Sequence, residues 1–163
     1  MSILNQFSLA GKTALVTGSN KGIGKAMALG LAEAGADIIA VSASIELQGS
    51  AIENEVKALG RSFRAYQADF SDRDSVYAFI KKVLEENKHI DILVNSAGVN
   101  PSKRHFRDLS VEDWKNTVDV NLSGMFYGWR NRWRSLAAMQ SAVAVLRHEV
   151  DALHAGGDAT REN

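Results

Sequence analysis

Three glycines, Gly18, Gly22 and Gly24, mark the stretch of this sequence with the clearest chemical meaning. They follow the apolar run Ala14-Leu15-Val16, and a helical pattern begins at Ile23. A strand that ends in a glycine-rich turn before a helix directs backbone N–H groups and the positive helix end at one point. Glycine permits positive φ and lets a pyrophosphate approach the backbone. We therefore expect a dinucleotide to contact Gly18, Ser19, Asn20, Lys21, Gly22, Ile23 and Gly24.

As a bare pattern, three glycines after a strand also fit ordinary turn chemistry. Their spacing after Thr17, Gly-x-x-x-Gly-x-Gly, differs from the commoner Gly-x-Gly-x-x-Gly. It resembles the TGxxxGxG turn of the short-chain dehydrogenase/reductase family. The resemblance covers roughly residues 7–128. Three further matches follow in the family's order, namely Ala68-Asp69-Phe70, Asn95-Ser96-Ala97-Gly98 (usually NNAG) and Asn121.

Asp69 has two compatible interpretations. In the family the matching aspartate meets the adenine edge, assisted by the next backbone N–H, which is here that of Phe70. Asp69 or Ser71 also fits as the cap of the following helix. The spacing Ser71-x-x-Asp74 is that of a capping box.

The resemblance also implies roles near the nicotinamide. Asn95, Ala97 and Gly98 match a segment whose small residues let the backbone approach the ribose and nicotinamide. Asn121 matches a residue of the catalytic tetrad whose backbone holds a water linked to the catalytic lysine. The alternative for Asn121 is a polar residue that bends a helix.

The residues after the second predicted strand bear on the choice between NAD and NADP. NAD-selective enzymes commonly place a carboxylate there to bind the ribose 2′-hydroxyl. Here the sequence reads Ser42-Ala43-Ser44, with no carboxylate before Glu46, so nothing repels a 2′-phosphate. A basic residue at the position of Lys21 accompanies NADP in the family, although Lys21 also fits as a solvated loop residue. We expect NADP(H) in preference to NAD(H).

Hydride transfer in the family needs a serine and a Tyr-x-x-x-Lys pair, whose lysine lowers the pKa of a proton-transferring phenol. Both follow the segment of Asn121 in the family. Beyond Asn121 this sequence has one tyrosine, Tyr127, and no lysine follows Lys115. Tyr77-x-x-x-Lys81 matches the string but precedes the other motifs, on a helix expected far from the nicotinamide. The catalytic half is therefore expected to be absent from a truncated chain.

Three functions remain open. The first is a truncated family member that binds NADP(H) or NAD(H), with hydride transfer absent or very weak. The second is an active oxidoreductase on a carbonyl or sugar-acid substrate, with catalytic groups completed by oligomerisation or by Tyr127. The third is an interaction protein with a vestigial nucleotide site. Residues 7–12 and 89–94 resemble the matching segments of family members that act on gluconates. This similarity indicates common descent with those enzymes but leaves the substrate open.

Alternating strand-like and helix-like segments predict an α/β fold, a Rossmann-like parallel sheet of about four strands flanked by helices. The predicted strands are residues 13–17, 38–41, 63–68 and 92–95. The helices between them carry apolar residues at helical spacing. The predicted buried stripes are Ile23, Met27, Leu31 and Ala34; then Ile52, Val56 and Leu59; then Val76, Phe79, Ile80 and Val83. A fourth helix opens at Ser110, with Asp113 completing a capping box.

The amino-acid composition changes after residue 128. This change predicts a dinucleotide-binding domain (residues 1–128) followed by a divergent helical tail (residues 129–163). The tail contains no Lys, Ile, Phe or Tyr, and we expect a shifted reading frame or a fused segment. Its apolar residues continue the fourth helix with heptad spacing, so the fold ends in a long helix over residues 111–155. Such a helix needs a partner, and we expect a homo-oligomer, with folding back onto the sheet edge as the alternative.

Length and composition exclude several classes of protein. With 163 residues, of which 45% are hydrophobic, the chain suits one core. A formal net charge of zero gives no general case for nucleic acid, despite a short basic aromatic patch at residues 129–134. The absence of cysteine removes disulfides and thiolate metal sites, and no metal is expected. With no long apolar run or basic leader, we expect no membrane partner and a cytoplasmic location.

Overall fold

The computed structural model describes residues 6–100 and 105–130. Its centre is a parallel sheet with the strand order β3-β2-β1-β4. The strands are β1 (Thr13–Thr17), β2 (Asp37–Val41), β3 (Phe63–Tyr66) and β4 (Ile92–Val94). In the register, Leu15 of β1 pairs with Ile39 of β2 on one side and with Leu93 of β4 on the other. The predicted α/β fold with about four parallel strands is confirmed.

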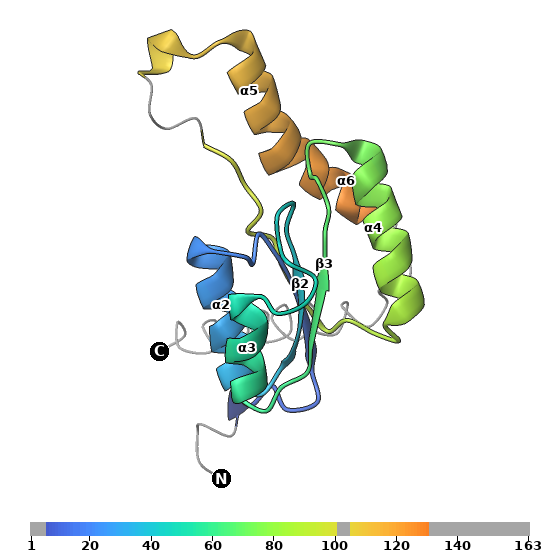
Figure 1. Cartoon of the computed structure of the whole chain (residues 1–163). Coiled ribbons are helices and arrows are strands. Elements are labelled where there is room, and N and C mark those ends of the chain that lie inside the picture. Colours follow the sequence, from blue (N-terminus) through green and yellow to red (C-terminus); the bar gives the residue numbers. More distant parts are fainter. Residues whose placement is uncertain (1–5, 101–104, 131–163) are drawn as a thin grey trace, which may run out of the picture.

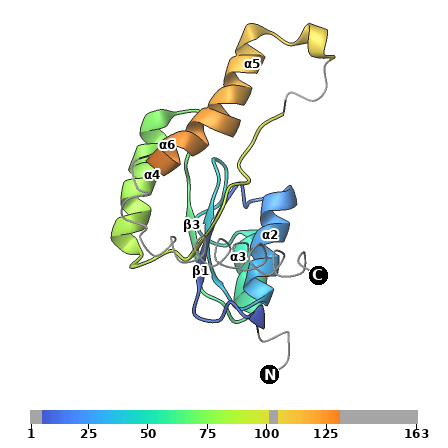
Figure 2. The same cartoon turned by 180° about the vertical axis from the view of Figure 1, so that it is seen from behind.

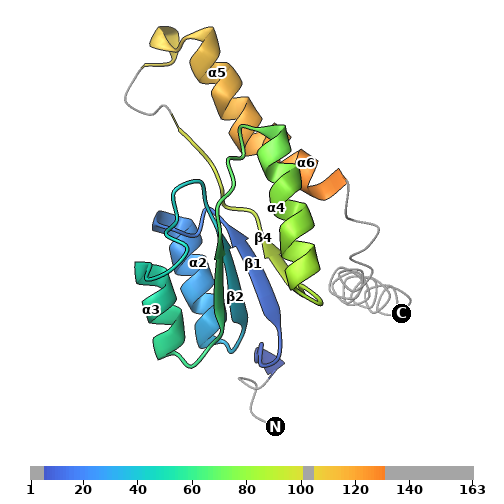
Figure 3. The same ribbon diagram turned by 45° about the vertical axis from the view of Figure 1, so that its right-hand side comes forward.

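Helices cover both faces of this sheet. The helices α2 (Gly22–Glu33) and α3 (Ala51–Ala58) lie on one face, and α4 (Arg73–Glu86) lies on the other (Figures 1 and 3). Successive side chains of a strand point to opposite faces, so each strand supplies two cores. Ala14 and Val16 of β1 belong to the core beneath α2 and α3, whereas Leu15 belongs to the core beneath α4. Burial of both faces explains the continuous apolar runs in the sequence.

The first helix confirms Leu31 of its predicted stripe, which packs partly buried against the core, but its fully buried residues lie on a different face. Ile23 and Met27 were expected in the core, but they are 72% and 45% exposed. The glycine turn fixes the rotation of α2, because a Cβ on Gly24 would collide with the backbone oxygen of Gly18. This contact turns the face of Gly24 inward. The residues that α2 buries are Gly24, Ala28 and Ala32, which let the helix lie close to the sheet.

The second helix confirms two of its three predicted core residues. Ile52 and Val56 are buried, but Leu59 is exposed. The reason is that α3 ends at Ala58 and Leu59 is its C-cap, so the helical spacing no longer positions this side chain.

The starts of the later helices show one correction and one confirmation. Asp72 caps α4, its carboxylate accepting a hydrogen bond from the N–H of Asp74 at 3.0 Å. The expected cap at Asp69 or Ser71 is wrong, because the Ser71 hydroxyl donates back to Asp69 instead. The predicted capping box of Ser110 with Asp113 is present at the start of α5.

A continuous helical segment forms the C-terminal part of the described structure. It consists of α5 (Val111–Val118), the π-helical turn η2 (Asp119–Gly124) and α6 (Met125–Arg130), preceded by the short helix η1 (Phe106–Asp108). α5 extends beyond the carboxyl ends of the strands, while α6 lies beside α4 (Figures 1 and 2). The predicted continuation to residue 155, and the tail from residue 131 onward, lie outside the described residues.

No helix in the described part of the chain has both the length and the apolar character needed to cross a lipid bilayer.

Candidate functional site

A groove with a volume of about 580 Å³ lies at the carboxyl ends of the four strands. Open α/β sheets bind ligands at this edge, where the loops that follow the strands converge. The groove brings together ten of the predicted site residues: Gly18, Lys21, Gly22, Ile23, Gly24, Ser42, Asp69, Phe70, Ala97 and Gly98. It is completed by Ala43, Ala68, Ser96, Val99 and Val120.

The glycine turn of the groove is shaped so that other residues would not fit. Gly18 has φ +68°, and a Cβ there would lie 2.6 Å from the backbone oxygen of Ser96. Gly22 has φ +59° with open space beside it, so conformation rather than crowding requires glycine at this position. This bare backbone surface is what a pyrophosphate needs for close approach.

Thr17 fastens the glycine turn to the loop after β4. Its hydroxyl is buried and accepts hydrogen bonds from the backbone N–H groups of Ser96 and Ala97, both at 2.9 Å. On the other side, the N–H of Gly18 donates to the backbone oxygen of Val41 at 2.8 Å. The end of β1 is thereby tied to both neighbouring strands, so the turn is held before any ligand arrives.

The start of α2 is open to an anion. Lys21 is the N-cap residue, and its side chain accepts no hydrogen bond from the first turn, which also contains no acidic residue. The unpaired N–H groups and the helix dipole therefore favour negative charge at this end. The Lys21 side chain is exposed at the groove and forms no ion pair with another described residue.

The loop after β2 forms another wall of the groove, and two side chains hold it in place. The Asn20 amide donates to the backbone oxygen of Ser44 at 3.3 Å. The Gln67 amide donates to the backbone oxygen of Ile45 at 2.7 Å, and the Ile45 side chain is fully buried. Asn20 was predicted as a cofactor contact, and the structure places its amide on this loop rather than in the lining of the groove.

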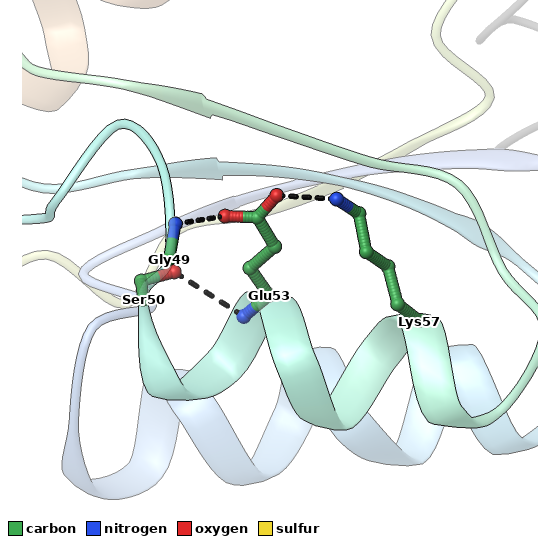
Figure 4. Close-up of polar contacts among 4 residues, drawn as sticks. All are labelled: Gly49, Ser50, Glu53 and Lys57. Atoms are coloured by element: carbon green, nitrogen blue, oxygen red, sulfur yellow. Dashed lines mark hydrogen bonds and ion pairs between the residues drawn. The ribbon is translucent and has the colours of Figure 1, made fainter.

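The far end of the same loop is fixed at the start of α3 (Figure 4). Ser50 caps the helix by accepting from the N–H of Glu53 at 3.2 Å. The Glu53 carboxylate accepts from the Gly49 N–H and from the Lys57 ammonium, each at 2.6 Å. The hydrogen bond from Lys57, followed by that from Gly49, lowers the pKa of Glu53 below its ordinary value. The carboxylate is therefore charged at neutral pH and keeps the loop anchored.

Asp69 lies in the groove with its carboxylate partly engaged. Its Oδ1 atom accepts from the backbone N–H of Ser71 at 2.8 Å and from the Ser71 hydroxyl at 2.7 Å. The Asp69 N–H donates to the hydroxyl of Ser75 at 2.9 Å. These three bonds fix the orientation of the aspartate while leaving it exposed at the groove.

Asn121 hydrogen-bonds to the loop after β4 through both the oxygen and the nitrogen of its side-chain amide. Its oxygen accepts from the backbone N–H of Val99 at 2.8 Å, and its nitrogen donates to the Val99 oxygen at 3.0 Å. Asn121 therefore contacts the groove wall without lining the groove. Sequence reasoning missed Val99 and Val120 as lining residues, although each is adjacent to a recognised motif residue.

Three other expected residues lie apart from the groove lining. Asn95 borders a smaller apolar cavity of about 70 Å³ between β4, α4 and α6. Ser19 is fully buried, and its hydroxyl has no hydrogen-bond partner among the described residues. The ring of Tyr127 packs edge-on against Tyr77 of α4, with 6.2 Å between centroids, and neither tyrosine lines the groove.

The groove combines bare glycine backbone with a helix start that no side chain caps, and comparison of the sequence with known proteins identifies the family. The sequence profile described as short chain dehydrogenase matches residues 12–147. The chain belongs to the short-chain dehydrogenase family of oxidoreductases.

Among individual proteins, the chain is similar to the 2-dehydro-3-deoxy-D-gluconate 5-dehydrogenase of Pseudoalteromonas atlantica. The two are 56% identical over 147 residues, which make up 88% of this chain and 56% of that enzyme. The chain thus spans about half the length of the curated relatives it matches.

Solved structures resemble the described fold. A 3-oxoacyl (acyl-carrier-protein) reductase from Agrobacterium tumefaciens C58 with NADP bound has a TM-score of 0.74 and 30% identity, covering 86% of this chain and 53% of its own. An NADH-dependent reductase, A1-R′, complexed with NAD has a TM-score of 0.73 over 87% of this chain and 58% of its own. At 22% identity, the second likeness shows the fold alone. Structural neighbours therefore hold either NADP or NAD.

Proposed function

We propose that the 163-residue chain binds NADP(H) in the groove, with hydride transfer absent or very weak. The observation that carries the proposal is the start of α2. There the bare backbone of Gly18 and Gly22 adjoins a helix end that no side chain caps. Bound NADP(H) would supply a hydride donor or acceptor, and the chain's own residues would hold its phosphates and adenosine.

The preference for NADP(H) over NAD(H) rests on charge. Lys21 offers an exposed ammonium at the groove without a partner among the described residues. The loop after β2 presents Ser42 and Ala43 to the groove, and neither residue would repel a 2′-phosphate. A phosphate near Lys21 would gain a charge-assisted hydrogen bond that a ribose hydroxyl cannot match.

The proposed weakness of turnover rests on the described lining of the groove, which contains no tyrosine or histidine. Its ionisable lining residues within the described part are Lys21 and Asp69. Reduction of a carbonyl needs a general acid within hydrogen-bond reach of the substrate oxygen. Tyr127 is held against Tyr77, so the structure gives no support to Tyr127 as that acid.

A second candidate function is a sugar-acid oxidoreductase completed by association of chains. One observation favours it, the exposed apolar face of α5, η2 and α6. Val111 is 84% exposed and Trp114 is 61% exposed, and Leu122 and Phe126 continue the row. An apolar helix face of this kind suits an interface between subunits. We propose that copies of the chain associate through this face. The cytoplasmic location of the protein remains a prediction from the sequence.

The proposed cofactor site is tested by calorimetric titration with NADPH and, separately, NADH. We expect saturable binding of NADPH, weaker binding of NADH, and loss of both in Gly22→Val, because valine cannot adopt the positive φ of Gly22 without strain. The matched control is Gly30→Val, which has open space at its Cβ and lies outside the groove. Absence of binding by the wild type would overturn the proposal.

A further inference from the structure

We infer that the π-helical turn η2 sets the spacing between two walls of the groove, and that Gly124 is its positioning residue. One wall is the loop after β3, which contains Phe70, and the other is the loop after β4, which contains Val99. The inference rests on the proposed function insofar as the groove holds a dinucleotide. The spacing of the two walls is also a property of the free protein, so it can be tested without a ligand.

Gly124 gives η2 its contact with the first wall. The glycine is buried, and a Cβ at this position would collide with the backbone oxygen of Phe70 and lie 3.0 Å from its carbonyl carbon. These atoms belong to backbone and cannot rotate away as the end of a side chain can. The turn therefore rests directly on the loop that carries Asp69 and Phe70, and only glycine permits this approach.

Asn121 gives the same turn its contact with the second wall. Its amide holds both the N–H and the oxygen of Val99, at 2.8 and 3.0 Å. On the same turn, Val120 is buried and lines the groove itself. One turn of helix thus touches both walls and part of the surface between them.

The π-helical form explains how one turn reaches two walls. In an α-helix, residues three positions apart lie on nearly the same face. A π-helical turn holds more residues, so Asn121 and Gly124 are separated by a wider angle around the axis. Each then meets a different loop. A change at Gly124 that lifts the turn from Phe70 should therefore also disturb the grip on Val99.

The test compares three variants of the full chain. Gly124→Ala adds one methyl group at the crowded contact. Gly128→Ala, the control, adds the same group in α6, where the nearest atom would be Ile80 Cδ1 at 3.9 Å, an ordinary contact. Asn121→Ala releases Val99 without adding any group, so it tests the same spacing even where Gly124→Ala fails to fold. The measurements are the Kd for NADPH and hydrogen exchange at the amides of Val99 and Ser71 without ligand.

We expect Gly124→Ala and Asn121→Ala to weaken NADPH binding by about tenfold, or about 1.4 kcal/mol, because both walls move from the spacing that fits the ligand. We expect Val99 to exchange faster in both, and Gly128→Ala to match the wild type. Unchanged exchange at Val99 in Gly124→Ala would overturn the inference, as would wild-type affinity in both variants. A wild type that binds no NADPH would instead overturn the proposed function.

Discussion

The side-chain hydroxyl of Thr17 accepts a hydrogen bond from the backbone N–H of Ala97 at 2.9 Å. The two residues are far apart in sequence, yet the bond joins the end of β1 to the loop after β4. It holds these segments at the distance at which Gly18 touches the backbone of Ser96 and Ala97. A polar atom buried inside the sheet thus supports the shape of the groove.

Replacement of Thr17 by valine should destabilise the protein without a change in side-chain volume. The partly buried N–H groups of Ser96 and Ala97 would lose their acceptor, and an unpaired group costs roughly 1–3 kcal/mol when it is fully buried. Urea unfolding should therefore show a lower midpoint for Thr17→Val. Thr17→Ser keeps the hydroxyl and should remain close to the wild type. Equal midpoints for the valine and serine variants would contradict this role.

Removal of the Lys21 ammonium should change cofactor selectivity. We expect Lys21→Ala to weaken NADPH binding by about tenfold, the loss of one hydrogen bond to a charged group, and to leave NADH binding nearly unchanged. Added salt should weaken NADPH binding in the wild type more than in the variant. The control is Lys25→Ala, whose ammonium pairs with Glu55 at 2.6 Å outside the groove. Parallel losses for NADPH and NADH would speak against the charge argument.

Asp91 should make the free energy of unfolding depend on pH. Although burial tends to raise its pKa, hydrogen bonds from the Thr13 N–H and the Lys12 ammonium hold the pKa below the ordinary value of 3.8. A carboxyl group with a lowered folded-state pKa contributes stability above its unfolded pKa, and loses it as pH falls through the folded value.

Asp91→Asn should therefore be less stable than the wild type at pH 7, by about 1 kcal/mol for the lost charged hydrogen bonds. The difference should start to shrink below about pH 4, where the carboxyl of the unfolded chain takes up a proton, and should vanish only below the lower pKa of the folded state. Urea midpoints at pH 7, 5 and 3 measure this trend. A difference that stays constant over this range would refute it.

A negative charge on the exposed face of α5 should separate the subunits. Trp114 is largely exposed on a helix that extends beyond the sheet (Figure 2). We expect sedimentation at micromolar concentration to show an oligomer for the wild type and a monomer for Trp114→Glu, because a buried unpaired carboxylate is costly. The control is Glu112→Gln, a charge change beside the same face. A wild type that sediments as a monomer would remove the basis for association through α5.

Much of the fold could be predicted from the sequence because local patterns determine it. Short β-branched runs such as Ile38-Ile39-Ala40-Val41 indicate buried strands, and Ser110 with Asp113 marks a helix start. The first half of the buried face of α2, Ile23 and Met27, was predicted wrongly, because a tertiary contact between Gly24 and Gly18 sets the rotation of the helix. The spacing of apolar residues shows which of them share a helix face. It does not show how the preceding turn rotates the helix, and therefore which face is buried.

The candidate site was predictable where backbone chemistry dictates the residue type. The glycines, Lys21 and Asp69 were found in this way, and the structure brings them to one groove. Val120 could not be found, because an apolar residue in a helix gives no signal that it faces a groove. The π-helical turn was also missed, since its form follows from the contacts of Asn121 and Gly124 with distant loops.

The pairing of β1 with β4 has a consequence for the order in which the chain folds. Ala14 pairs with Ile92, and the crossover between them includes two other strands and three helices. Such non-local pairings form late, because closing a long loop costs entropy before the contacts are made. During synthesis, the glycine turn can be complete near the N-terminus of a growing chain while the amide partners of Thr17 have not yet been made. The ribosome must therefore release residue 97 before the turn acquires its final support.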